Sequence, residues 1–161
     1  MTGAARAPKV VMTCGMTCSG KSTYARELEQ RSYVWLSVDH DSWGLGYEQH
    51  PLPPEVQRDI KVAQKRRLRE LIAEGRDVVL EYAFASRSRR DEYRRLAREA
   101  GAEVSFVFFD VPLDELLRRL EARNAGPRTA HSVIVEPDQV VRWYESFEWP
   151  QPDETDVTTI R

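Results

Sequence analysis

Two kinds of apolar pattern alternate along the chain. Short apolar runs, typical of buried parallel strands, occur at residues 10–12, 34–38, 78–80 and 104–109, and a last short strand is expected at 157–160. Between them, apolar residues recur at near-helical spacing, which predicts helices over about 20–30, 53–75, 87–100, 112–123 and 136–147. We therefore expect a three-layer α/β fold, with a five-stranded, mainly parallel sheet, helices on both faces and a helical lid.

The segments without either pattern predict loops. Residues 42–54 combine glycines, prolines and aromatic residues, and residues 124–131 contain Gly126 and Pro127. The second of these loops, with its flanks, is expected to form a mobile lid over about residues 119–135. Residues 1–8 are expected to be a flexible lead-in. No internal repeat is evident, so residues 1–161 are interpreted as a single domain.

A glycine-rich segment between the first strand and the first helix carries the strongest chemical signal. Residues 15–22 match G-x-x-x-x-G-K-[ST] at every fixed position. Its two glycines can take backbone angles closed to other residues, so the loop can point successive N–H groups at phosphate oxygens. The helix that follows adds a partial positive charge of roughly half a unit.

This motif predicts a site for ATP and Mg²⁺. Lys21 would reach the β- and γ-phosphates, and the Ser22 hydroxyl would bind the metal ion. A glycine-rich turn that binds nothing is the alternative. The nucleotide-binding residues would be Gly15, Met16, Thr17, Cys18, Ser19, Gly20, Lys21, Ser22 and Thr23.

Carboxylates follow two of the predicted strands, at the sheet edge where α/β proteins bind ligands. Asp39 is the first candidate for a catalytic base, because an aspartate there could accept the proton of an acceptor hydroxyl. Asp41 and His40 are rivals, and either aspartate could instead cap a turn. Glu81, after the third strand, could hold a Mg²⁺-bound water or an acceptor group.

Arginines flank the predicted lid. Arg119 and Arg123 precede it and Arg128 lies within it, and such side chains could stabilise a transferring phosphoryl group. Solvated arginines are the alternative for each.

Aromatic residues near the candidate carboxylates suggest an acceptor pocket. We hypothesise that Trp43 and Tyr47 help to line it, although they could equally anchor the loop to the core. Tyr82 and Phe84 follow Glu81 and could also face the acceptor. His50 has no evident partner and is interpreted as a surface residue.

Composition narrows the classes of partner. The 24 basic and 26 acidic residues give a net charge of −2, which argues against duplex DNA or an anionic membrane as a partner. Thirteen basic residues lie between Arg58 and Arg98, whereas the tail from Glu136 is mostly acidic. Solvated helix faces are the favoured explanation, and a docking surface for a polyanion is the alternative.

The cysteines and the hydropathy of the sequence indicate the cellular compartment in which we expect the protein. Cys14 and Cys18 lie in or beside the phosphate loop and lack further ligands for zinc, so they are interpreted as free thiols in a reducing cytosol. No apolar run approaches the roughly 20 residues of a membrane span. We expect a cytoplasmic protein that is a monomer or a weak homodimer.

Taken together, the motifs resemble those of the small P-loop kinases called AAA-domain ATP-binding proteins, which are related to chloramphenicol phosphotransferase, zeta-type toxin kinases and polynucleotide kinase domains. The stretches that carry the resemblance are GMTCSGKST (15–23), LSVDHD (36–41), VVLEYAFASRSRRDEYRRLA (78–97), FFDVPLDELLRRLEARN (108–124) and FEWPQPDE (147–154).

The resemblance implies specific roles. It places the catalytic base at Asp39 and the lid arginines at Arg119 and Arg123. Relatives usually carry Asp where this chain has Glu81. Polynucleotide kinases place an Arg three residues after the base, and this chain has Ser42 there.

We therefore expect an ATP-dependent kinase that phosphorylates a hydroxyl of a small molecule such as an antibiotic, a nucleoside or a sugar nucleotide. A nucleic-acid 5′-hydroxyl kinase is possible but disfavoured by Ser42 and by the net charge. A nucleotide-dependent binding or switch protein is the further alternative.

Overall fold

The computed structural model describes residues 5–161. In this part of the chain the strands are β1 (Lys9–Gly15), β2 (Val34–Ser37), β3 (Val78–Glu81), β4 (Glu103–Phe109) and β5 (Val157–Ile160). The helices are α1 (Lys21–Glu29), α2 (Val38–Gly44), α3 (Pro54–Ala73), α4 (Arg87–Glu99), α5 (Leu113–Ala125) and α6 (Pro137–Ser146). Among the helices of residues 5–161, none combines the length and the hydrophobicity of a membrane span.

The predicted lead-in lies partly outside the described residues, because residues 1–4 are not among them. Residues 5–8 precede β1, and there Arg6 Nη2 lies 2.9 Å from Asp77 Oδ2.

The described strands form one sheet in the order β2-β3-β1-β4-β5, and all of their pairings are parallel. This confirms the predicted α/β fold. Met12 of β1 pairs with Leu80 of β3 on one side and Phe106 of β4 on the other, so β1 is the central strand. The chain places β2 and β3 on one side of β1 and then β4 and β5 on the other. In such sheets ligands bind where the strand order reverses, at the carboxyl ends of the strands.

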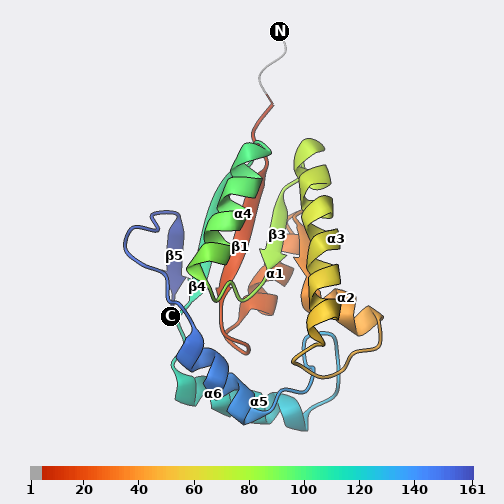
Figure 1. Ribbon diagram of the computed structural model, residues 1–161, viewed down its shortest axis with the longest axis vertical. Helices are drawn as coiled ribbons and strands as arrows, with labels where there is room; N and C mark the ends of the chain where they lie inside the picture. The colour runs from red at the N-terminus through yellow and green to blue at the C-terminus, as the bar shows by residue number, and fades with distance from the viewer. Residues whose placement is uncertain (1–4) are drawn as a thin grey trace.

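The two faces of the sheet are covered by different helices. Alternate residues of a strand point to opposite faces, so Val11 packs with Leu28 of α1 on one face. Val10 and Met12 pack with Leu68 and other residues of α3 and α4 on the opposite face. Figure 1 shows α3 and α4 in front of the sheet and α1 behind it. The continuous apolar runs of the sequence follow from this burial on both faces.

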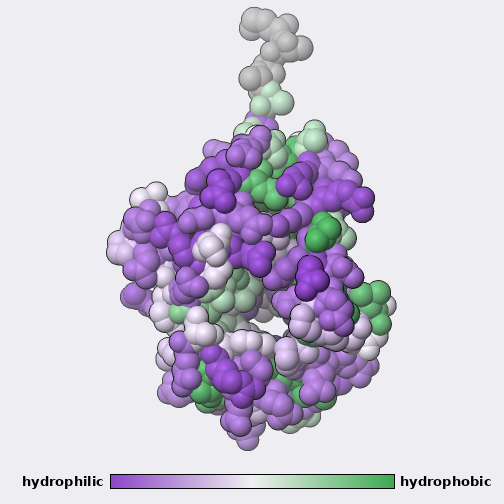
Figure 2. All heavy atoms as spheres, in the orientation of Figure 1, coloured by the Kyte–Doolittle hydropathy of each residue, from purple (hydrophilic) through white to green (hydrophobic). Residues whose placement is uncertain are grey.

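Helices α5 and α6 lie side by side across the carboxyl ends of the strands (Figure 1). Leu116 and Leu120 of α5 and Val140 of α6 are buried against the main core. In Figure 2 the surface is hollowed between this helical pair and the body of the sheet. The hollow therefore lies at the edge where the sheet topology favours ligand binding.

Helix α2 corrects the predicted boundaries. The strand expected over 34–38 ends at Ser37, and the loop expected over 42–54 begins later because Val38–Gly44 are helical. Ser37 caps the helix, since its Oγ accepts a hydrogen bond from the His40 backbone N–H at an N···O distance of 3.3 Å. Asp39 and Asp41 lie in the first turn, where the helix dipole favours negative charge.

The prediction of solvated helix faces is wrong for part of the basic region. Arg90 of α4 is fully buried, and its Nε lies 2.7 Å from Glu154 Oε1. Arg94 is also buried, and its Nη2 lies 2.8 Å from Asp156 Oδ1. Carboxylates of the acidic C-terminal segment therefore compensate the charges of these two arginines.

Candidate active site

The phosphate loop has a tightly enclosed backbone. A Cβ at Gly15 would lie 2.9 Å from Ser19 Oγ and 3.2 Å from the Phe109 carbonyl oxygen, so only glycine fits there. Gly20 has a φ of 107° and Cys18 a φ of 65°. These positive φ values let the backbone of the loop curve back on itself. Helix α1 begins directly after Gly20, and its free N–H groups and positive dipole end lie at the loop. A loop of this kind fits a phosphate group.

Lys21 lies at the centre of the site and folds back over the loop. Its Nζ donates a hydrogen bond to the Met16 carbonyl oxygen at 2.6 Å. Desolvation in the cavity lowers the pKa of Lys21, and the nearby carboxylates of Glu81 and Asp39 oppose that shift. An ammonium group in this environment is suited to bind an anion such as a phosphate.

Glu81, at the end of β3, is hydrogen-bonded to Ser22, which directly follows Lys21, and to Trp35 of β2. Its Oε2 accepts a hydrogen bond from Ser22 Oγ at 3.1 Å, and its Oε1 accepts one from Trp35 Nε1 at 3.0 Å. Burial and the charge of Asp39 raise the pKa of Glu81 to about 7.

The donors around Glu81 fit a divalent cation. Asp39, Glu81 and His131 each place a ligand atom within 4.8 Å of the others. Carboxylate and hydroxyl oxygens such as those of Glu81 and Ser22 are suitable ligands for Mg²⁺.

Asp39 is held by His50, across the turn that follows α2. His50 Nε2 lies 3.1 Å from Asp39 Oδ1, so the prediction that His50 is an unpartnered surface residue is wrong. Burial alone would raise the pKa of Asp39, but the hydrogen bond from His50 and the charges of Lys21 and Arg123 hold it below its ordinary value.

Asp41, the rival carboxylate, points to a different partner. Its Oδ2 accepts a hydrogen bond from Gln64 Nε2 at 2.7 Å. Of the two aspartates, Asp39 lines the cavity. The geometry therefore favours Asp39 over Asp41 as the group that faces a ligand.

Two of the three lid arginines reach the phosphate loop. Arg119 Nη1 donates to the Cys18 carbonyl oxygen at 3.1 Å, and Arg123 Nη1 lies 3.4 Å from Thr17 Oγ1. The buried Arg123 Nε has no hydrogen-bond partner among the described residues. Arg128 instead donates to the Ser132 carbonyl oxygen at 3.0 Å, within the lid itself.

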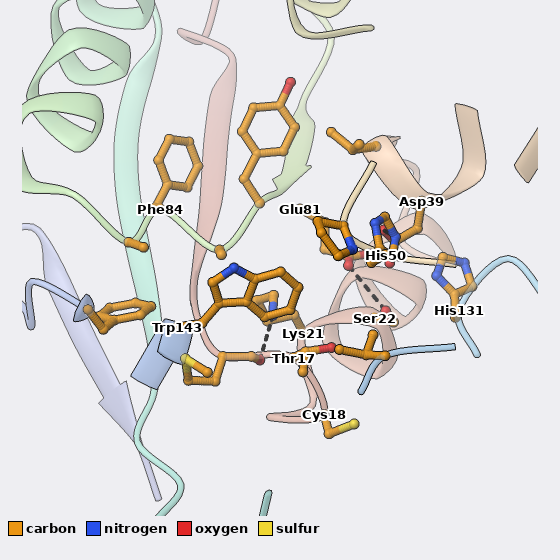
Figure 3. Close-up of a pocket in the computed structure, with 18 of the residues that line it drawn as sticks. Thr17, Cys18, Lys21, Ser22, Asp39, His50, Glu81, Phe84, His131 and Trp143 are labelled. Atoms are coloured by element: carbon orange, nitrogen blue, oxygen red, sulfur yellow. Dashed lines mark hydrogen bonds and ion pairs between the residues drawn. The ribbon is translucent and has the colours of Figure 1, made fainter. Parts of the chain in front are cut away.

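The cavity has a volume of about 730 Å³, which is ample for a small-molecule ligand. Tyr82 and Phe84 line it as predicted, whereas Trp43 packs against the core instead. In Figure 3, Asp39, His50 and Glu81 lie on one side of the cavity and Phe84 and Trp143 on the other. Trp143 of α6 was not anticipated as a cavity residue.

Tyr47 is likewise not among the described residues that line the cavity. The hypothesis that Trp43 and Tyr47 line the acceptor pocket is therefore wrong.

Comparisons with known proteins identify the family of the chain. The family described as "AAA domain" matches residues 10–148. The bifunctional enzyme NodQ of Rhizobium meliloti (strain 1021) is 36% identical over 124 residues, a match that covers 70% of this chain and 18% of NodQ. The chain thus spans less than a fifth of the length of this relative.

Solved structures show the same fold. A gluconokinase from Sinorhizobium meliloti 1021 is similar over 96% of this chain and 83% of its own, with a TM-score of 0.67 and 21% identity. Kti12 of Chaetomium thermophilum, in complex with ADP-AlF3, is similar over 94% of this chain and 88% of its own, with a TM-score of 0.76 and 17% identity. These likenesses show the P-loop kinase fold.

Proposed function

The chain belongs to the AAA-domain family and has the P-loop kinase fold, and from this premise we propose that it is an ATP- and Mg²⁺-dependent kinase for a hydroxyl group of a small molecule. The observation that carries the proposal is that one cavity is lined by the phosphate loop with Lys21 and by an ionised, partly buried Asp39.

Within the proposed mechanism, the chain holds the nucleotide by its phosphates. The loop N–H groups and Lys21 would bind phosphate oxygens, while Ser22 and Glu81 would hold the metal ion. When bound, Mg²⁺ supplies charge neutralisation on the phosphate oxygens. Arg119 and Arg123 reach the loop from α5, where a guanidinium stabilises charge that develops during transfer.

Asp39 orients the acceptor. Its lowered pKa keeps the carboxylate ionised at neutral pH, so it can accept a hydrogen bond from a hydroxyl. It can then take the proton as the hydroxyl oxygen attacks the γ-phosphorus and the bond to the β–γ bridging oxygen breaks to release ADP. A positioned base of this kind typically contributes about 10² to 10⁴ in rate. His50 fixes the carboxylate through the 3.1 Å contact at Oδ1, which leaves Oδ2 for the acceptor.

Two features weigh against a nucleic-acid 5′-hydroxyl kinase. Ser42 is buried, and its Oγ donates to the Asp39 carbonyl oxygen at 3.2 Å, so no cation lies three residues after the proposed base. Several arginines of α4 are engaged by the acidic C-terminal segment. A nucleotide-dependent switch remains the alternative that needs no acceptor.

The test is a screen of ATP consumption with Mg²⁺ across nucleosides, sugars, aminoglycosides, chloramphenicol-like compounds and a short 5′-hydroxyl oligonucleotide, followed by mass spectrometry. We expect a small-molecule product heavier by one phosphoryl group. Asp39→Asn should lower its formation by at least about 100-fold, while Asp41→Asn serves as the matched control. An Asp39→Asn enzyme with unchanged transfer would contradict the proposed base.

A further inference from the structure

The cavity that contains Asp39 is also lined by cations of α3 and α4. Lys61 of α3 and Arg89 of α4 both line the cavity that contains the phosphate loop. The same two side chains also line an adjoining hollow, together with Arg58 and Lys65. The acceptor side of the cavity is therefore continuous with a basic surface that is separate from the phosphate loop.

The charges in this group are not balanced within the described residues. The carboxylate of Glu92 is shared by two of the cations: Lys65 Nζ contacts its Oε1, and Arg89 Nη1 lies 3.3 Å from its Oε2. Lys61 has no carboxylate within 4.0 Å in the described part of the chain. Its Nζ lies instead 5.1 Å from the centroid of the Tyr82 ring.

This environment disfavours the charged form of Lys61 unless an anion is present. Burial lowers the pKa of Lys61, and the neighbouring charges of Arg89 and Lys65 lower it further. A partly desolvated cation without a counter-ion is costly, and an anionic ligand would remove that cost. The charge of Glu92 opposes this shift in the pKa only in part, so an anion bound beside Lys61 would stabilise its charged form.

Apolar and aromatic side chains also line this cavity. Phe84 and Trp143 lie on the far side of the cavity from Asp39 (Figure 3), and Leu52 also lines it. A ligand in this cavity would thus meet a carboxylate, apolar and aromatic surface, and cations.

We propose that the acceptor is an anionic small molecule, which presents a hydroxyl to Asp39 and a phosphate, sulfate or carboxylate group to Lys61 and Arg89. This inference rests on the proposed function and narrows its substrate class. A free small molecule is favoured over a nucleic-acid strand because the site is a cavity, and because the α4 arginines 90, 94 and 98 are already paired with the C-terminal segment.

Inorganic sulfate is the probe for the anion site. The full chain is first saturated with Mg²⁺ and AMPPNP, so that the phosphate loop is occupied, and sulfate is then titrated at constant ionic strength while heat or tryptophan fluorescence is recorded. We expect saturable binding that Lys61→Gln and Arg89→Gln each weaken by about 10-fold or more, since each removes a charge-assisted contact. Arg66→Gln, on an exposed position of the same helix, is the matched control and should bind sulfate as the wild type does.

Absence of saturable sulfate binding, or equal binding by wild type and Lys61→Gln, would overturn the proposal. A short 5′-hydroxyl oligonucleotide is titrated in parallel. Lys61-dependent binding of this strand far more tightly than sulfate, with a steep dependence on salt, would assign the anion to nucleic acid and overturn the small-molecule acceptor.

The nucleotide titration is read separately from the sulfate titration. A failure of AMPPNP to bind would contradict the proposed kinase function. Lys61-dependent sulfate binding would then still establish the anion site.

Discussion

His50 illustrates how a single contact can organise the proposed chemistry. It lies in the loop after α2, and its ring nitrogen holds one oxygen of Asp39 at 3.1 Å. The contact lies inside the cavity that also contains Lys21. His50 is therefore interpreted as a positioning residue, which acts through Asp39 rather than on the substrate.

Replacing His50 should impair the orientation of Asp39 without weakening the binding of ATP. We expect His50→Ala to lower kcat by about 10- to 100-fold, because the freed carboxylate loses its orientation toward the acceptor hydroxyl. His50→Gln keeps a hydrogen-bond donor and should recover part of that loss. Steady-state kinetics with each variant would measure this, and the KM for ATP should not change. A His50→Ala enzyme with wild-type kcat would show that Asp39 needs no such support.

At the scale of the elements, the C-terminal segment stabilises α4 through buried ion pairs with its arginines. Arg90 is fully buried, and the Glu154 side chain that pairs with it has no exposed surface. Glu154 also accepts a hydrogen bond from Arg94 Nη2 at 2.9 Å. Burial alone would raise the pKa of Glu154, but the hydrogen bonds from the two arginines and from the Gln151 backbone hold it at about 2.

Glu154→Gln should therefore be strongly destabilising at neutral pH. The variant leaves the buried Arg90 charge uncompensated, a change that costs about 3 to 5 kcal/mol of unfolding free energy. Asp153→Asn is the matched control: Asp153 is 68% exposed and its pair with Arg87 is screened by solvent, so its loss should change the unfolding free energy far less than Glu154→Gln does. Chemical denaturation of the three proteins at pH 7 measures both values.

The same pair predicts a pH dependence. The folded-state pKa of about 2 lies below the ordinary value of 4.5, so the contribution of Glu154 is complete above pH 4.5 and is lost as the pH falls toward 2. The gap in stability between wild type and Glu154→Gln should accordingly narrow across that range. A gap that stays constant from pH 7 to pH 2 would contradict this role for Glu154.

The elements that could be predicted from the sequence are those with local signals. The phosphate loop, the apolar strands and the helix predicted over about 87–100 depend on neighbouring residues, and the structure contains them. Helix α2 was missed because the glycines and aromatic residues that follow Ser42 suggest a loop, although Ser37 supplies a helix cap.

Contacts between distant residues could not be predicted in this way. The pairing of Arg90 with Glu154 joins residues 64 positions apart. The local sequence of α4 therefore predicts a solvent-exposed arginine at a position that is buried in the structure. Trp143 is similar, because its position on α6 gives no sign that α6 closes the cavity beside the phosphate loop.

At the scale of the whole molecule, α5 links the lid to the nucleotide site. Arg123 donates to the Val133 carbonyl oxygen at 2.9 Å, and another of its nitrogens lies 3.4 Å from Thr17 in the phosphate loop. One guanidinium thus contacts both the lid backbone and the loop. A nucleotide bound in the loop would take over the second contact.

Arg123→Gln should lower kcat by about 100-fold or more, because it removes a cation from the charge that develops on the phosphoryl group. Arg118→Gln is the control on the same helix, since Arg118 is 70% exposed and pairs with Glu115. Rates measured at saturating ATP, with thermal unfolding as a check on folding, would test this. Equal losses in the two variants would count against a specific role for Arg123.

The most direct test of the central claim is to follow the fate of the γ-phosphoryl group. ATP labelled at that group is incubated with Mg²⁺, the protein and a small-molecule cell extract, and the products are separated. We predict label in an organic phosphate, absent with Lys21→Ala and sharply reduced with Asp39→Asn. Label found in inorganic phosphate alone, at a rate that neither the extract nor Asp39→Asn changes, would contradict the kinase account and favour a nucleotide-dependent switch.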